Sequence, residues 1–320
     1  MVSSSDRPPT RLLTTLSRRA LAAVGTMWAA ATIAFFALRL AGGDPTQSLV
    51  AQGLASAEQA AALRAELGLD APLLDQYARF LVGLIQGNLG ESLYTRRPVV
   101  TTIAEQLPST LALAAGAIVV SLLIGTSLGI VAGWRPETLL GRAADAISAM
   151  STGIPVAVAG ILALLAAAAA ARVVPSVLFL TRAGNVALPA VTLGFATSGA
   201  LARAVQAGLA DSRSAPFIVA ARARGIPPGW RLLWHALRPA LPVAVSLAAL
   251  QAAFLLSGTV VTETVFSRPG LGRLLVSSIL QGDFPVVQGL VVLAAILYTT
   301  TQAIADGLAV ILDPRLGETS

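Results

Sequence analysis

The sequence has no cysteine and no lysine, and it holds a single histidine, His235. Without cysteine there are no thiolate nucleophiles, thiolate metal sites or disulfides. Without lysine there is neither a phosphate-binding loop ending in Gly-Lys nor a Schiff base. Charged residues are also scarce, at 12% of 320 residues, against about 25% in soluble domains. These absences argue against the common nucleophilic enzymes, against histidine metal clusters and against a water-soluble globule.

Long apolar runs take the place of the missing charges. Hydrophobic residues make up 55% of the chain, and a helix that spans a membrane needs about 20 mostly apolar residues. The pattern predicts an all-α protein with six membrane-spanning helices, at residues 20–40, 109–133, 147–171, 187–208, 240–262 and 285–311. The first run is too long for a signal peptide and lacks a small-residue cleavage pattern, so we expect it to stay as an anchor.

The basic residues, all arginine, gather between alternate predicted spans and give the chain a net charge of +6. Twelve of the 22 lie in the segments 1–19, 134–146, 209–239 and 312–320. Because arginine is retained on the cytoplasmic side of membranes, both termini are predicted to be cytoplasmic. This retention also accounts for the positive charge without a nucleic-acid partner. The segment 41–108 then becomes a large extracytoplasmic loop.

The loop 41–108 carries two helix patterns. Ser56 followed by Gln59 is typical of a capping box, and the helix that it starts is predicted to end at Gly68. A second helix is predicted from about Pro72 to Gln86, with one face formed by Leu74, Tyr77, Phe80, Leu81 and Leu84. We expect this second helix to lie on the outer membrane surface. The alternative is a platform for an extracytoplasmic partner.

Small residues recur every fourth position in the second predicted span, at Ser121, Gly125, Gly129 and Gly133. Positions four apart share one helix face, and small residues there let a neighbouring helix approach closely. The spacing predicts a packing seam, either within this chain or against another subunit.

The cytoplasmic segment 209–239 has a distinctive pattern. Its alanine-rich start predicts a short helix that ends at Gly225. Pro227-Pro228-Gly229 interrupts it, and a second helix is predicted from Trp230 to Leu237. Anionic lipid would explain the arginines here. It would not explain a helix of small residues that ends in glycine.

At this segment the sequence resembles the membrane-spanning permease subunit of ATP-binding-cassette importers, in the dipeptide, oligopeptide and nickel branch. That family has stretches like Ala221-Arg222-Ala223-Arg224-Gly225 and His235-Ala236-Leu237-Arg238. The resemblance runs in the family's order from about residue 20 to 315, through Gly43-Asp44-Pro45, Leu67-Gly68-Leu69-Asp70, Gly87-Asn88-Leu89-Gly90-Glu91-Ser92-Leu93, Leu107-Pro108-Ser109-Thr110-Leu111, Ile154-Pro155-Val156, Leu188-Pro189, Glu263-Thr264-Val265-Phe266-Ser267-Arg268-Pro269-Gly270-Leu271-Gly272, Asp283-Phe284-Pro285 and Asp313-Pro314-Arg315. Gln206 departs from the family's pattern, in which arginine is common at this position. No role is therefore transferred to it.

The resemblance implies a type I importer permease fold in the cell membrane. It divides the chain into a cytoplasmic segment 1–19, a first span 20–40, the extracytoplasmic loop 41–108, a five-helix core 109–311 that includes the loop 209–239, and a cytoplasmic tail 312–320. The chain would form half of a translocation pore together with a second homologous permease subunit. Cargo would come from an extracytoplasmic substrate-binding protein, either free or lipid-anchored.

The resemblance also implies that this chain is no enzyme and carries no cofactor of its own. One or two partner ATPase subunits would bind ATP and magnesium. The short helix would dock on one of them and couple hydrolysis to transport, through Ala220, Ala221, Arg222, Ala223, Arg224 and Gly225.

Ionisable residues occur at the ends of several predicted spans, namely Arg39, Arg203, Glu263 and Asp306. Snorkelling toward water accounts for Arg39 and Asp306. The other two lie in family-like surroundings, and we interpret them as parts of the pore or its outer gate, together with Phe266, Pro269 and Gly270. His235 fits a polar residue on a cytoplasmic helix better than a pH-sensitive contact.

The function predicted from these patterns is the import of di- or oligopeptides. One histidine, three methionines and no cysteine offer few ligands for a bare transition metal. A nickel chelate or another small solute stays an alternative within the family. An ion-driven secondary transporter is an alternative from another class, but it would need acidic residues in mid-span, and these are nearly absent. A non-transporting scaffold is a further alternative.

Overall fold

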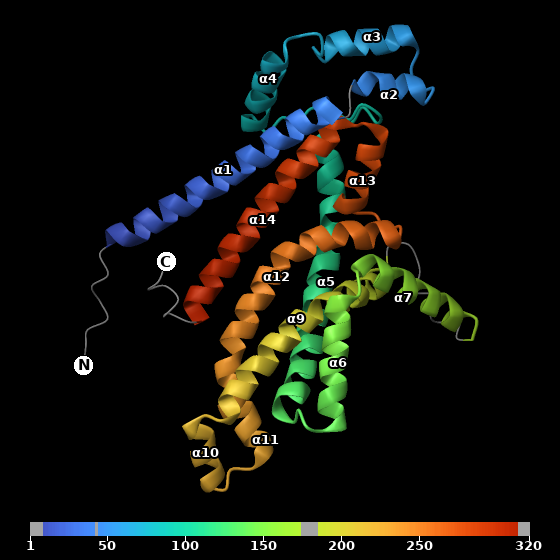
Figure 1. Ribbon diagram of the computed structural model, residues 1–320. Helices are drawn as coiled ribbons and strands as arrows, with labels where there is room; N and C mark the ends of the chain where they lie inside the picture. The colour runs from blue at the N-terminus through green and yellow to red at the C-terminus, as the bar shows by residue number, and fades with distance from the viewer. Residues whose placement is uncertain (1–8, 42–43, 174–184, 313–320) are drawn as a thin grey trace. The chain divides into compact units, whose positions relative to one another are not determined.

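The computed structural model describes residues 9–41, 44–173 and 185–312 (Figure 1). Within these ranges every regular element is a helix, and one isolated antiparallel bridge joins Glu91 to Pro98. The predicted all-α class is therefore confirmed. Contacts divide the chain into two units, Met1–Glu105 with Ser277–Thr299, and Gln106–Val276 with Thr300–Ser320.

The first unit contains the predicted loop helices. Its elements are α1 (Pro9–Ala41), α2 (Pro45–Ala51), α3 (Ala57–Glu66), α4 (Leu73–Ile85) and the first part of α14 (Phe284–Leu312). At the start of α3, Ser56 Oγ accepts from the Gln59 N–H and Gln59 Oε1 accepts from the Ser56 N–H, at 3.2 and 2.8 Å. Gly68, with φ at +61°, follows the end of α3. Both predicted loop helices and the capping box are confirmed.

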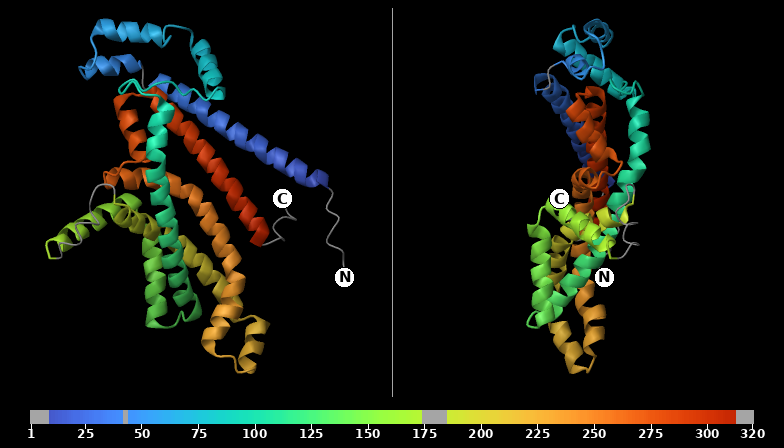
Figure 2. Two further views of the ribbon diagram at one scale, coloured as in Figure 1. Left: turned by 180° about the vertical axis from the view of Figure 1, so that it is seen from behind. Right: turned by 90° about the vertical axis from the view of Figure 1, so that its right-hand side faces the viewer.

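The second unit is built around α9 (Ala187–Arg213), as two further views show (Figure 2). Its other long elements are the greater part of α5 (Val99–Trp134), α6 (Leu139–Gly153), α7 (Val156–Ala171) and α12 (Leu237–Val265), and α13 (Leu271–Gln281) begins in it. Helices α6, α7 and α12 all contact α9. Two clusters of buried side chains form its core. One joins α5, α9 and α12 through Leu113, Ala117, Ala190, Leu193 and Leu255. The other packs α9 and α12 against the segment between them, through Leu201, Val205, Leu209, Ile218, Ala236 and Ala244.

The predicted small-residue seam lies between α5 and α9. A Cβ atom on Gly125 would come within 2.7 Å of the Ser198 carbonyl oxygen, and one on Gly129 within 2.5 Å of the Ala202 carbonyl oxygen. Only a missing side chain lets two helix backbones come this close. The seam is therefore confirmed, and it joins two helices of the same chain.

Among the described residues, four helices are long and apolar enough to cross a membrane, α1 over Ala20–Leu40, α5, α9, and α14 over Phe284–Ala305. Helix α12 covers the predicted fifth span, 240–262, in one stretch of 29 residues. The predicted third span, 147–171, is wrong as one continuous helix, because the chain bends by 111° between α6 and α7. Proline disfavours helical backbone at the residue before it, and Ile154, before Pro155, is extended with ψ at 121°. The total of six spans and the orientation of the chain in the membrane stay predictions.

Some sequence predictions fall outside the described residues. These are positions 1–8 of the N-terminal segment, Gly43 of the Gly43-Asp44-Pro45 motif, nearly all of the tail 312–320 with its Asp313-Pro314-Arg315 motif, and the side chain of Asp306.

Candidate functional site

The segment 209–239 forms a short helix, a turn and a second helix. Helix α10 (Pro216–Ala223) is followed by α11 (Pro228–Trp230) and the π-helix η2 (Arg231–Ala236). Ile218 and Ala221 are buried, at 2% and 4% exposure, and Ile218 packs in the cluster around α9 and η2. The predicted helix-turn-helix is confirmed, and the core of the second unit holds α10 in place.

Gly225 ends α10 through its backbone conformation. Its φ is +75°, in the left-handed region where glycine is favoured. The Ile226 N–H donates to the Ala221 carbonyl at 3.1 Å, and the Gly225 N–H donates to the Arg222 carbonyl at 3.0 Å. These two bonds form a Schellman motif. A Cβ on Gly225 would meet nothing within 4 Å, so the surface beside the turn is open.

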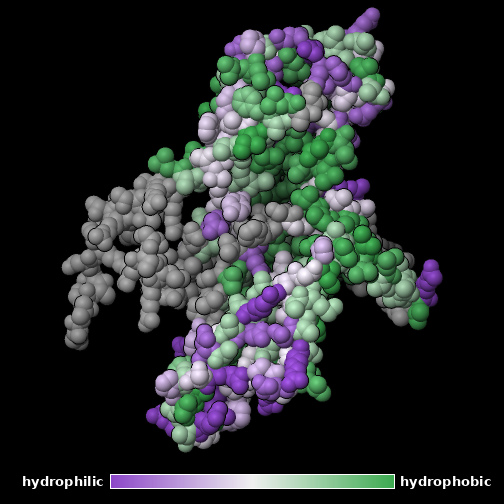
Figure 3. All heavy atoms as spheres, viewed as in Figure 1, coloured by the Kyte–Doolittle hydropathy of each residue, from purple (hydrophilic) through white to green (hydrophobic). Residues whose placement is uncertain are grey.

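Most of the predicted contact residues are exposed, Ala220, Arg222 and Ala223 on α10 and Arg224 and Gly225 in the turn that ends it. Ala221 instead faces the core. Phe217 and Val219 are 46% and 58% exposed and make the exposed face of α10 more apolar. Sequence analysis missed these two, although each lies about 100° round the helix from Ile218 and thus off its buried face, which could have identified them. Hydrophilic residues gather over this end of the second unit, whereas apolar ones cover α7 (Figure 3).

Beside α10, α11 and η2 present aromatic surface that the sequence analysis did not single out. The rings of Trp230 and Trp234 are stacked with centroids 5.8 Å apart, and each residue is 58% exposed. His235 lies on the same π-helix, and its Nδ1 is buried without a hydrogen-bond partner.

Glu263, near the end of α12, is completely buried. Its carboxylate accepts hydrogen bonds from Thr110 Oγ1 at 2.6 Å, the Gly272 N–H at 2.8 Å and the Arg273 N–H at 3.2 Å. The last two are orphan donors in the first turn of α13, where a negative charge is favourable. Glu263 therefore joins α5, α12 and α13.

The turn after Glu263 is shaped around this carboxylate. A Cβ on Gly270 would lie 2.2 Å from it, so only glycine fits there. Pro269 accepts a hydrogen bond from Ser109 Oγ, and Arg268 Nη1 donates to the Ser109 carbonyl at 2.7 Å. Burial lowers the pKa of the Arg268 guanidinium, and the charge of Glu263 partly offsets this. Phe266 lies beside Gly160 of α7.

Arg203 lies on a face of α9 that meets α6. Its Nη2 donates to Thr152 Oγ1, and one turn further Gln206 Nε2 donates to Asp145 Oδ1 at 3.1 Å. Arg203 and Glu263 have different partners, so the structure shows no direct contact between these two candidates.

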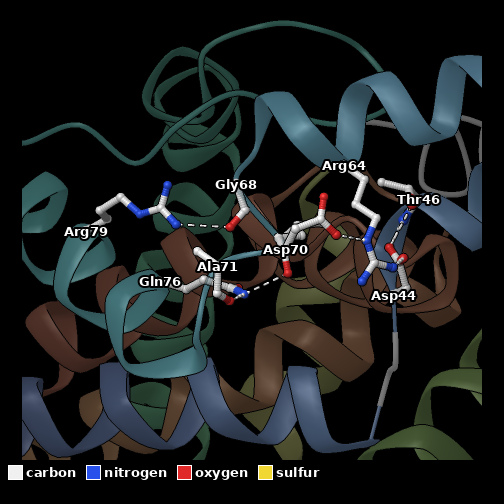
Figure 4. A network of polar contacts seen from close by, with 9 residues as sticks. Asp44, Thr46, Arg64, Gly68, Asp70, Ala71, Gln76 and Arg79 are labelled. Carbon is white, nitrogen blue, oxygen red and sulfur yellow. Dashed lines mark hydrogen bonds and ion pairs between the residues drawn. The ribbon is translucent and has the colours of Figure 1, made fainter.

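Within the first unit, an ion-pair network connects two of the sequence motifs (Figure 4). Arg64 donates to both Asp44 and Asp70. Asp44 also caps α2, because it accepts from the Thr46 N–H at 2.9 Å. Burial alone would raise the pKa of the Asp44 carboxyl, but the bonds from Thr46 and the charge of Arg64 outweigh it and lower the pKa. Arg79 donates to the Gly68 carbonyl in the same loop.

Two more motifs of the first unit meet at Asp283, directly before α14. Its carboxylate accepts from Ser92 Oγ at 2.6 Å and from the Leu93 N–H at 3.2 Å. Burial raises the pKa of Asp283, and these bonds oppose it. In the described part of the chain, no group of three or more His, Asp or Glu residues is placed to hold a metal ion.

Several described helices that are long and apolar enough to cross a membrane, together with the short exposed helix α10, define the class of multi-pass helical membrane proteins. A family described as "Binding-protein-dependent transport system inner membrane component" matches residues 125–318, and a model of its N-terminal part matches residues 12–114. The chain therefore belongs to this family, the permeases of ABC importers. The family comprises transport subunits and not catalytic enzymes.

Named relatives match over nearly the full chain. The "Probable peptide ABC transporter permease protein y4tP" of Sinorhizobium fredii is 31% identical over 93% of this chain and 97% of its own length. The glutathione transport system permease protein GsiC of Escherichia coli is 32% identical over 95% and 99%. A solved structure of the MetNI methionine ABC transporter in inward-facing conformations shares the fold, with a TM-score of 0.55 and 22% identity, over 67% of this chain and 97% of the solved one.

Proposed function

We propose that this chain forms half of the translocation pore of an ATP-driven importer in the cell membrane, with di- or oligopeptides as cargo. The names of the two relatives, a peptide permease and a glutathione permease, support this class of cargo. The observation that carries the proposal is the exposed face of α10, which the core positions through Ile218 and Ala221. Partner ATPase subunits bind ATP and magnesium, dock on this face and drive the pore between its inward-open and outward-open states.

The first test is to isolate the tagged chain from its native membrane under conditions that preserve known transporter complexes, and to identify its partners by mass spectrometry. We expect a second permease and one or two ATPase subunits at stoichiometric levels. An extracytoplasmic binding protein, free or lipid-anchored, would accompany them. Recovery of the chain alone would contradict the proposal and favour an ion-driven transporter or a scaffold.

A matched pair of variants tests the docking face itself. Ala220→Trp adds bulk on the exposed side of α10, whereas Ala210→Trp adds the same bulk at an exposed position of α9. Both chains should insert normally, but only Ala220→Trp should abolish ATPase association and coupled uptake. Normal uptake by Ala220→Trp would exclude α10 as the coupling element. Gly225→Trp is a less specific test because it also strains the backbone.

We also propose that Arg203, Glu263, Phe266, Pro269 and Gly270 shape the pore or its outer gate. The support is the rigid turn that the Glu263 carboxylate organises at the junction of α12 and α13. A Glu263→Gln chain that reaches the membrane should show reduced uptake. Uptake equal to wild type would contradict the gate assignment.

A further inference from the structure

Helix α4 has an apolar face that no described residue of this chain covers. Its exposed apolar residues Leu74, Ala78, Val82 and Ile85, here called the outer stripe, follow one another at helical spacing. Leu74, Val82 and Ile85 are 72%, 53% and 87% exposed. A continuous apolar surface of this kind marks a contact with a partner or a membrane.

The opposite side of α4 packs on α1. The rings of Tyr77 and Phe80 lie 5.2 and 5.4 Å from the ring of Phe35, measured between centroids. The Tyr77 hydroxyl is 2.7 Å from Thr32 Oγ1, and Arg39 Nε donates to Gln76 Oε1 at 3.0 Å. Arg39 also lies over the Phe35 ring. The Arg39 side chain is thus held by its hydrogen bond to Gln76 of α4 and does not simply extend toward water.

These contacts fix the depth of α4 in the membrane. The apolar part of α1, Ala20–Leu40, has 21 residues. At 1.5 Å per residue they rise about 32 Å, which matches a hydrocarbon core of about 30 Å. The contacts from Thr32 to Arg39 occupy about 10 Å of this rise. They therefore lie inside one hydrocarbon leaflet.

Sliding α1 along its axis does not remove α4 from this depth. If Thr32 stood at the membrane surface, Arg18 and Arg19 would enter the hydrocarbon at the other end. Burying an arginine in hydrocarbon is unfavourable, with a cost that reaches about 2.5–3.5 kcal/mol at the centre of the bilayer. The same shift would expose Ile33 and Leu40 to water. Both apolar side chains lie open on the surface of α1, at 68% and 79% exposure, so no described residue of this chain would shield them.

The polar groups of α4 are arranged for such a position. In hydrocarbon each polar group needs a partner, and the hydroxyls of Tyr77 and Thr32 bond to each other. Gln76 Nε2 donates to the carbonyls of Leu69 and Ala71. The charged residues Asp75 and Arg79 share the remaining face, where Arg79 reaches the Gly68 carbonyl of the loop.

We propose that the outer stripe contacts lipid acyl chains, so that α4 is embedded in the leaflet at the Arg39 end of α1 and does not rest on the membrane surface. The space-filling view shows apolar side chains over α4 (Figure 3). The embedded helix widens the lipid-facing surface that begins with the exposed apolar residues of α1. The proposal does not depend on the transport function or on the sidedness of the chain.

The natural absence of cysteine allows a direct test with single-cysteine variants of the full chain. Two adjacent pairs are matched, Leu74→Cys with Asp75→Cys, and Ile85→Cys with Gln86→Cys. Each variant is labelled with a small fluorophore in phosphatidylcholine vesicles. Quenching is then measured with nitroxides on the acyl chains and with iodide in the water. Far-ultraviolet circular dichroism confirms that each variant is folded.

At positions 74 and 85 we expect acyl-chain nitroxides to quench several-fold more strongly than at positions 75 and 86, and iodide to quench several-fold less. Equal iodide quenching within each pair would overturn the proposal in favour of a helix in water. Protection of positions 74 and 85 from both quenchers would also overturn it, because a protein surface would then cover the outer stripe.

Discussion

Two buried carboxylate groups, those of Glu263 and Asp283, lie beside the first turn of a helix. Glu263 accepts from two N–H groups in the first turn of α13, and Asp283 directly precedes α14 and accepts from Ser92 and Leu93. Burying a carboxylate is costly unless hydrogen bonds replace its hydration. Because these bonds come from distant segments, each carboxylate fixes tertiary structure in addition to its own helix.

Replacing Glu263 with glutamine should destabilise the second unit. The amide NH2 group of Gln would face N–H donors that now point at a carboxylate oxygen. We expect a loss of about 2 kcal/mol, typical of hydrogen bonds to charged groups, measured as a lower unfolding temperature of the detergent-solubilised chain. The neighbouring Thr264→Ala, at an exposed position, should change little. Equal unfolding temperatures for both variants would show that the Glu263 bonds do not stabilise the fold.

At the scale of elements, α5 and α9 make a close backbone contact along the glycine seam. Gly125 and Gly129 place one backbone directly against the carbonyls of the other. In a membrane there is no hydrophobic drive between helices, so such packing supplies much of their association.

Gly129→Val should therefore separate α5 from α9. The new Cβ would lie 2.5 Å from the Ala202 carbonyl oxygen and 2.7 Å from the Val205 Cβ. We expect destabilisation by at least about 2 kcal/mol, seen as a lower yield of monodisperse protein and a lower unfolding temperature. The control is Gly25→Val in α1, where a Cβ meets nothing within 4 Å. If the two variants behaved alike, the seam would not be a stabilising contact.

The stability of the loop in the first unit depends on pH through the Asp44 carboxyl group. Because its pKa is lowered in the fold, the ionised network contributes stability above the unfolded value of about 3.9. That contribution is lost as the pH falls through the lower folded value. Asp44→Asn keeps a good helix cap but removes the charge that Arg64 pairs with.

We therefore expect Asp44→Asn to have a lower unfolding temperature than wild type at pH 7, and the difference to shrink toward pH 3. Thermal unfolding of both proteins across this range measures it. A difference that stays constant with pH would mean that ionisation of Asp44 contributes nothing to stability.

At the scale of the whole molecule, the arginine distribution predicts the sidedness of the chain. Glu58→Cys lies on α3 in the predicted extracytoplasmic loop, and Ser214→Cys lies between α9 and α10; both positions are exposed. A membrane-impermeant maleimide should label Glu58→Cys in intact cells. It should label Ser214→Cys only after permeabilisation. The reverse pattern would invert the predicted topology.

The sequence by itself determined the helical class, the loop helices with their caps, the seam and the helix-turn-helix. Local rules govern all of these, since helix periodicity, capping boxes and glycine at helix ends act over a few residues. The break of the third predicted span at Pro155 also follows a local rule, the effect of proline on the residue before it, which the prediction of that span did not apply. Only tertiary structure decided that Ala221 faces inward, and that Ser109 and Thr110 hold the Glu263 turn. These outcomes depend on which side chains from distant segments meet, and a pattern of spacing along one segment does not encode that.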